Sequence, residues 1–235
     1  MKKLFIGVLL ICSTAIKAGE AQTLPAKNFN AVFELYKSGL LVAESQYIFR
    51  QQQQPNFKSS SHLKGFVSLF NESEIAEQSF FDTSKNHIRL TQYQYKQTGD
   101  NNKQISSLVD WKRQRITTIR NDQKEIITPF KNTIWDKHSL LLALMSNAQK
   151  NDKELNLQVL DKGIVKLYKF IYTGSKEIEL DEDEWVVTSV WQRQTGNRKT
   201  VFYLDPKNHF IPLKIEQHKN QQQATLWLKE INWYE

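Results

Sequence analysis

Asp136, His138 and Ser139 stand close together in the sequence, and they are the three side-chain types of a hydrolytic triad. In such a triad a serine hydroxyl attacks the substrate, a histidine takes its proton, and an aspartate orients the histidine. That chemistry needs the serine in an exposed elbow, typically G-x-S-x-G, and the sequence contains no such motif. Neighbouring positions of a helix also point in different directions, so the three side chains are not expected to converge on one substrate. We therefore interpret the trio as the start of a helix, with Asp136 as its N-cap.

The segment 136–149 has the pattern of a helix that packs on a sheet. With Asp136 as N-cap, Trp135 and Leu140 occupy the two positions of a hydrophobic staple. Apolar residues then recur at helical spacing and form one stripe. We expect this helix to cover the concave face of a curved sheet. Our hypothesis is that it forms one wall of a ligand-binding site and strand aromatics the other, with these helix-side residues: Trp135, Leu140, Leu141, Leu144 and Met145.

No other cluster in the sequence offers better chemistry. The histidines do not form H-x-H or H-E-x-x-H, so we expect neither a metal site nor a cofactor. The acidic run Glu179–Trp185 lacks the alternating ligands and glycine of a calcium loop and is interpreted as a solvated hairpin tip. A concentrated basic face, typical of nucleic-acid binding, is not evident. We predict no enzyme; two acids, or an aspartate and a histidine, meeting in a cleft would change that prediction.

The first residues have the pattern of a secretory signal. Lys2 and Lys3 precede an apolar run too short to span a bilayer, and cleavage is expected after Ala18 or as late as Ala21. Cys12 raises the alternative of a lipoprotein, but a bulky isoleucine precedes it. Removal of residues 1–18 leaves no cysteine, and it lowers the formal charge from +7 to +4 because three lysines and no acid are lost. We expect a periplasmic protein without a transmembrane segment.

Residues 22–235 are predicted to form a single β-rich domain. Segments 29–37 and 40–50 flank Ser38-Gly39, a hairpin signal, and the second alternates apolar and polar residues as in a sheet wetted on one side. Short strand-like segments continue up to the helix and resume after it. This pattern predicts a mainly β (α+β) fold: a strongly curved antiparallel sheet or incomplete β-barrel with one covering helix around 136–149.

Several segments together resemble a family of exported bacterial proteins known only as a domain of unknown function (serial 3108). The resemblance is carried by "LYKSGLLVAES", "TPFKNTIWDKHSLLLAL", "VLDKGIVKLYKFIYTGSKEIEL" and "FYLDPKNHFIPLKIE". It implies an exported, mainly periplasmic protein with a curved antiparallel sheet and a covering helix. A looser similarity is to the LolA/LolB-like lipoprotein-carrier architecture, in which an incomplete barrel and its helices enclose acyl chains. The family supplies no catalytic residues.

Two functions follow as hypotheses. The first is non-catalytic binding of an apolar or amphipathic envelope ligand, such as a lipid or acyl chain, with peripheral contact to a membrane. The second is a filled β scaffold that acts as an interaction protein for an envelope complex or a polysaccharide, which an exposed strand edge or apolar patch would favour. If the helix plugs the sheet completely, the apolar stripe is core and there is no cavity.

Overall fold

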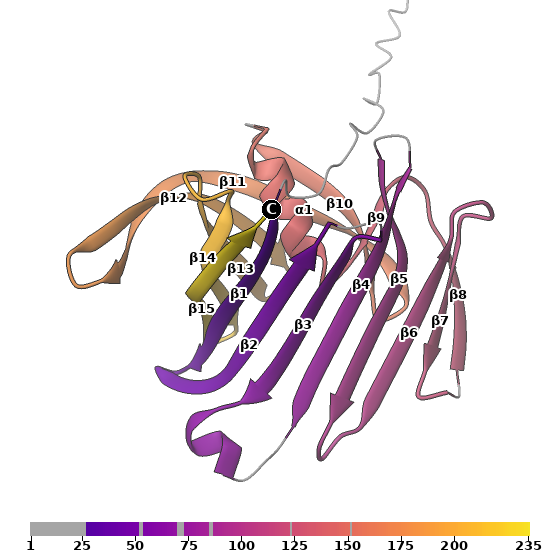
Figure 1. Ribbon diagram of the computed structural model, residues 1–235, viewed down its shortest axis with the longest axis horizontal. Coiled ribbons are helices and arrows are strands. Elements are labelled where there is room, and N and C mark those ends of the chain that lie inside the picture. Colours follow the sequence, from indigo (N-terminus) through magenta and orange to yellow (C-terminus); the bar gives the residue numbers. More distant parts are fainter. Residues whose placement is uncertain (1–26, 52–53, 70–72, 85–86, 123, 151) are drawn as a thin grey trace, which may run out of the picture.

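The computed structural model describes residues 27–51, 54–69, 73–84, 87–122, 124–150 and 152–235. The expected signal segment 1–18 and the expected start of the domain at residue 22 lie outside these ranges. The described residues form one sheet of 15 strands, a short α-helix and a 3₁₀ turn. Figure 1 shows that this sheet curls into two facing walls.

The first wall is an antiparallel meander in which each strand pairs with the next along the chain. A 3₁₀ turn, η1 (Gly65–Leu69), connects its third and fourth strands. The strands are β1 (Asn28–Lys37), β2 (Leu40–Arg50), β3 (Asn56–Leu63), β4 (Glu74–Ser84), β5 (His87–Thr98), β6 (Lys103–Asp110), β7 (Arg115–Arg120) and β8 (Lys124–Pro129).

The second wall begins with a short strand and the helix α1 (Leu140–Ala148) and then continues as another antiparallel meander. Its first two strands pair in parallel, and its last strand pairs with β1, so that the two walls form one continuous sheet. The strands are β9 (Ile134–Asp136), β10 (Glu154–Asp161), β11 (Ile164–Asp181), β12 (Glu184–Thr195), β13 (Arg198–Asp205), β14 (Ile211–Lys219) and β15 (Gln222–Tyr234).

Alternation along the strands decides which side chains face the space between the walls. On β1 and β2 the inward positions include Phe29, Phe33 and Phe49, and all three are fully buried. Ser38 and Gly39 join these two strands with φ angles of 52° and 80°. Two central residues with positive φ match the twist of a tight hairpin, as the Ser-Gly pair predicts.

The sheet does not close into a barrel, but its two ends come close together. The hydroxyl of Thr128 on β8 donates to the carbonyl of Gly163, in the turn between β10 and β11, at 2.7 Å. Gly163 has a φ of +76°, and a Cβ atom there would lie 3.2 Å from Thr118 Cγ2. Glycine is therefore favoured here both by the turn conformation and by the close approach of the two walls.

Helix α1 lies at one end of the space between the walls (Figure 1). All its residues from Leu141 to Ala148 are buried, the polar Ser146 and Asn147 among them, and its apolar side chains belong to the hydrophobic core. It begins at Leu140, four residues later than Asp136, because residues 134–136 pair with β10 as β9 and residues 137–139 form a turn. The expectation of a mainly β fold with a curved antiparallel sheet and one covering helix is confirmed; the expected start of the helix is wrong.

Candidate ligand-binding cavity

A cavity of about 460 Å³ lies between the two walls, beside the start of α1. This volume falls in the range of small-molecule sites, which is roughly 300–1,000 Å³. Both walls and the helix contribute to its lining. Its apolar lining comes from the start of α1 and from strands β1, β11, β13, β14 and β15, and includes Phe33, Leu141, Phe170, Phe202, Ile215 and Leu226.

The first polar group of the cavity is Glu77 on β4. Residues 75, 77 and 79 alternate on the inward face of that strand, which places this carboxylate between the walls. It accepts a hydrogen bond of 2.5 Å from the Tyr93 hydroxyl on β5. Burial raises the pKa of Glu77, the Tyr93 hydrogen bond opposes that rise, and the charge of Asp136 adds to it. The neutral form of the acid is therefore favoured more than in water.

His138 is the second polar group. Its ring is stacked on Phe57 with the centroids 4.3 Å apart, and its Nδ1 lies 3.0 Å from the Ser79 hydroxyl. Burial lowers the pKa of His138 to about 3, so the imidazole is neutral at physiological pH. Its buried Nε2 has no hydrogen-bond partner in the described part of the chain, although the residue lines the cavity. A ligand or a water molecule could supply that partner.

Asp136 and Ser139 are joined by two reciprocal hydrogen bonds. The Asp136 carboxylate accepts from the Ser139 backbone N–H at 2.8 Å, and the Ser139 hydroxyl accepts from the Asp136 backbone N–H at 3.1 Å. Ser139, not Asp136, is the N-cap residue, so the predicted capping register is wrong by three residues. Burial raises the pKa of Asp136. Of the three residues considered for a triad, His138 alone lines the cavity, since both other side chains are fully buried.

The five residues predicted for ligand binding fall into two groups. Leu140 and Leu141 line the cavity. Trp135, Leu144 and Met145 are at most 1% exposed, belong to the hydrophobic core, and are not among the residues that line it. The helix thus plugs one end of the space between the walls and borders the cavity only with its first turn.

Two cations complete the lining, and the sequence did not single out either of them. Lys137 precedes His138 in the turn before α1, and Arg193 comes from β12. The Arg193 guanidinium lies over the ring of Tyr168, with its Cζ 3.9 Å from the ring centroid. Alternation along β4 could have indicated Glu77, but nothing local indicates that Lys137 and Arg193 meet at one cavity.

Two further hollows lie outside the space between the walls. One is lined mainly by glutamine, serine and lysine side chains of β2 to β6. The other lies between the β11–β12 hairpin and strands β1, β14 and β15. The cavity between the walls is the stronger candidate site, because its lining is mostly apolar and includes a few polar side chains, among them Glu77, Lys137, His138 and Arg193.

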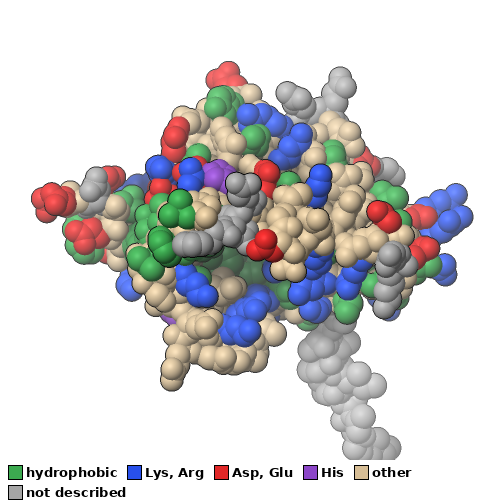
Figure 2. Space-filling view, turned by 90° about the horizontal axis from the view of Figure 1, so that it is seen from below, with side chains coloured by type: hydrophobic (Ala, Val, Ile, Leu, Met, Phe, Trp, Pro, Cys, Tyr) green, Lys and Arg blue, Asp and Glu red, His purple; other side chains and the backbone are tan. Residues whose placement is uncertain are grey.

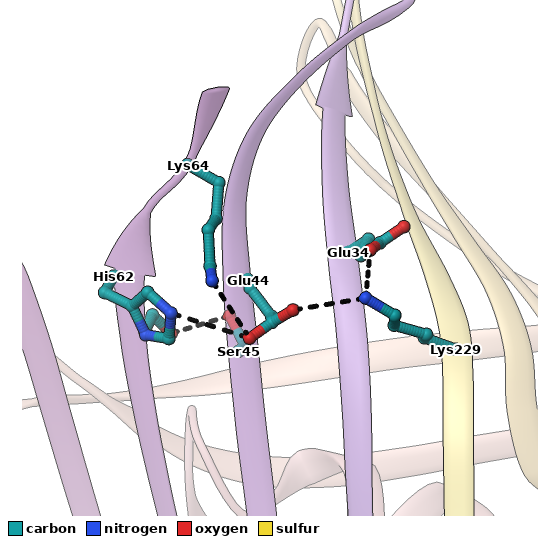
Figure 3. Close-up of polar contacts among 7 residues, drawn as sticks. Glu34, Glu44, Ser45, His62, Lys64 and Lys229 are labelled. Carbon is teal, nitrogen blue, oxygen red and sulfur yellow. Dashed lines mark hydrogen bonds and ion pairs between the residues drawn. The ribbon is translucent and has the colours of Figure 1, made fainter. Parts of the chain in front are cut away.

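A charge network ties four adjacent strands together on the outer face (Figure 3). Glu34 on β1 stands directly opposite Glu44 on β2, and Lys229 bridges them at 2.7 and 3.4 Å. The hydrogen bond from Lys229 lowers the pKa of Glu34, and Glu34 in turn raises the pKa of Lys229. His62 and Lys64 approach Glu44 at 3.5 and 3.6 Å. The lysine bridge offsets the repulsion of two like charges placed opposite each other.

An exposed apolar tip adjoins this network. In η1, Phe66 and Leu69 are 73% and 75% exposed, and Leu40 at the start of β2 is 70% exposed. Ser61 on β3 and Ile75 on β4, near the ends of these strands that the turn connects, line the cavity. The apolar tip therefore lies at the same end of the sheet as the cavity. Figure 2 looks onto this end and shows hydrophobic side chains at the surface.

The described residues offer neither a metal site nor a membrane-spanning helix. They contain no group of three or more histidine, cysteine, aspartate or glutamate side chains placed to hold a metal ion. Among the same residues there is no helix of the length and apolar character needed to cross a membrane.

A curved, unclosed antiparallel sheet around an internal cavity defines a β-barrel-like protein. The family model described as "Protein of unknown function (DUF3108)" matches residues 31–226, and the chain belongs to this family. The fold is also similar to the crystal structure of a β-barrel-like protein of domain of unknown function DUF1849 from Brucella abortus. That similarity has a TM-score of 0.60 and 11% sequence identity, over 91% of this chain and 100% of the other. No curated protein matches the chain.

Proposed function

We propose that this protein is a non-catalytic binder of an apolar or amphipathic ligand, such as a lipid or acyl chain, held in the cavity between the two walls. The observation that carries the proposal is the cavity itself. It is lined mainly by aromatic and aliphatic side chains, with a few polar side chains that include His138. Apolar cavities with a small number of placed polar groups are typical binding sites.

The proposed setting of this binding is the cell envelope. The pattern of residues 1–18 indicates export, and the ligand would then be an envelope molecule met in the periplasm. The LolA/LolB-like carriers are an analogy for an incomplete barrel that encloses acyl chains.

Native mass spectrometry tests the proposal. The protein is purified from the periplasm without detergent, its mass is measured under native conditions, and the bound material is extracted and analysed as lipid. A stoichiometric lipid, lost on denaturation, is expected. A clean apo mass that is unchanged after incubation with envelope lipids would contradict the proposal.

A pair of variants on β3 connects binding to the cavity. Ser61 faces the cavity and Ser60, its neighbour in the same strand, faces the other side of the sheet. Ser61→Phe should fill part of the cavity and reduce the bound lipid severalfold, whereas Ser60→Phe should leave it unchanged. Equal retention by the two variants would place the lipid elsewhere on the protein.

A second candidate is an interaction protein for an envelope complex or a polysaccharide. The apolar tip formed by Leu40, Phe66 and Leu69 favours it, because exposed apolar patches commonly mark contact surfaces. The double substitution Phe66→Ser and Leu69→Ser tests it, since both side chains are exposed and the fold should persist. Loss of cross-linking to an envelope partner in the variant, with lipid content unchanged, would favour this second function.

A further inference from the structure

We infer that the ligand of this cavity is an anionic amphiphile with one acyl chain, and that Lys137 and Arg193 bind its head group. The inference rests on the proposed function and names the chemical class of the ligand. The shared chemistry is a negatively charged head on a single chain, which the carboxylate of a fatty acid and the phosphate of a lysophospholipid both provide.

Neither cation of the cavity has a carboxylate partner in the described part of the chain. Lys137 and Arg193 take part in none of the ion pairs there, whereas other lysines of the same sheet are paired. Lys166, for example, lies 2.8 Å from the Asp161 carboxylate. Lys137 is exposed, and its charge acts to lower the pKa of Glu77 and of Asp161 without forming an ion pair with either of them. Two positive charges without an ion-pair partner beside an apolar cavity favour an anion.

A cation–π contact with Tyr168, rather than an ion pair, holds Arg193 in place. The guanidinium is stacked on the Tyr168 ring, and the Tyr168 hydroxyl donates to Asp161 at 3.2 Å. Since Lys166 already neutralises Asp161, the positive charge of Arg193 is not matched there. A guanidinium that is stacked through its face keeps N–H donors at its edge, and these suit a carboxylate or a phosphate.

Glu77 is the opposing charge, and it does not reverse the balance. The lining contains Lys137 and Arg193 against this one carboxylate, which gives a net charge of +1 when Glu77 is ionised and +2 when it is protonated. The carboxylate already accepts the Tyr93 hydroxyl. A cationic head group would meet two like charges, so the electrostatics favour an anionic head.

The remaining lining suits one acyl chain. Four large apolar side chains line the same cavity as the charged groups: Phe33, Phe170, Phe202 and Leu226. The volume of about 460 Å³ lies in the lower half of the range for small-molecule sites, which favours one chain over two.

Calorimetric titration below the micelle concentration tests the inference on the full mature chain. The probes are oleate, oleyl alcohol as the neutral analogue with the same chain, and oleoyl-lysophosphatidate. The variants are Lys137→Met and Arg193→Gln. Lys199→Met is the matched control, because it removes one positive charge from an exposed position next to cavity-lining Thr200. Circular dichroism verifies that each variant is folded.

Wild-type protein should bind oleate about tenfold or more tightly than oleyl alcohol, and each cavity variant should lose about tenfold for oleate. Binding of oleyl alcohol should change less than twofold in every variant, and the control should match wild type. The lysophosphatidate arm shows whether the site prefers a carboxylate or a phosphate. Equal binding of oleate and oleyl alcohol, unaffected by both variants, would overturn the head-group site and leave the proposed function standing. No binding of any probe to wild-type protein would overturn both.

Discussion

The wild-type protein should lose stability between pH 7 and pH 5, and replacing His138 by phenylalanine or asparagine should abolish much of this loss. The imidazole is buried against Phe57, and its pKa is lowered from 6.5 to about 3. The unfolded chain therefore binds a proton at this imidazole near pH 6.5, whereas the folded protein does not. This contribution to stability is fully present above the unfolded pKa and is lost as pH falls from about 6.5 toward 3. Between pH 7 and pH 5 the loss is about 2 kcal/mol.

Urea unfolding at pH 7, 6 and 5 measures this loss as a change in the free energy of unfolding. Phenylalanine keeps a ring on Phe57, and asparagine keeps a hydrogen-bonding atom toward Ser79. Each variant therefore preserves one of the two contacts that the imidazole makes. Both remove the titration. The raised pKa values of Glu77 and Asp136 increase the stability of the folded protein as the pH falls, opposite to the effect of His138. Wild type and variants share this contribution, so it largely cancels when their stabilities are compared. A loss of stability in both variants as large as in wild type would refute the assignment of a buried neutral histidine.

Three further predictions concern the core, the turn and the outer network. Leu144→Lys places an unpaired charge in the core and should destabilise the protein by about 4 kcal/mol or more. Leu140 is half-buried at the cavity, so the Leu140→Lys variant should remain folded. Thermal unfolding distinguishes the two variants. Gly163→Ala should cost more stability than Gly39→Ala by about 1 kcal/mol, because only the first also contacts the opposite wall; equal losses would contradict this. Lys229→Met should lower the unfolding temperature at low salt and much less at high salt, since two glutamates then face each other unbridged.

Local patterns predicted most of the fold. The Ser38-Gly39 turn and the alternation along β2 follow from short-range sterics, and both are confirmed. Errors occur where contacts distant in sequence decide the outcome. Segment 134–136 is a strand because β10 supplies its hydrogen bonds, and this pairing delays the start of the helix. Local patterns also do not show that β3 ends at Leu63 and that Phe66 and Leu69 form an exposed tip.

The candidate site was less predictable than the fold. Helical spacing predicted an apolar stripe that packs against the sheet, and its residues do lie in or against the hydrophobic core. The spacing could not distinguish Leu141, which lines the cavity, from Leu144, which lies in the core. That difference depends on how far the helix enters between the walls. The meeting of Lys137 and Arg193 depends on the pairing of all the strands of the second wall, which no local pattern encodes.

The most direct test of the account is photocross-linking with a fatty acid that carries a diazirine near the end of its chain. The cross-linked peptides are mapped by mass spectrometry on wild-type protein and on the Ser61→Phe variant. The account predicts one adduct per chain, on peptides of the cavity that contain Phe33, Phe170, Phe202 or Leu226, and a severalfold loss of adduct in the variant. Adducts confined to the exposed tip at Phe66 and Leu69, unchanged in the variant, would contradict binding between the two walls.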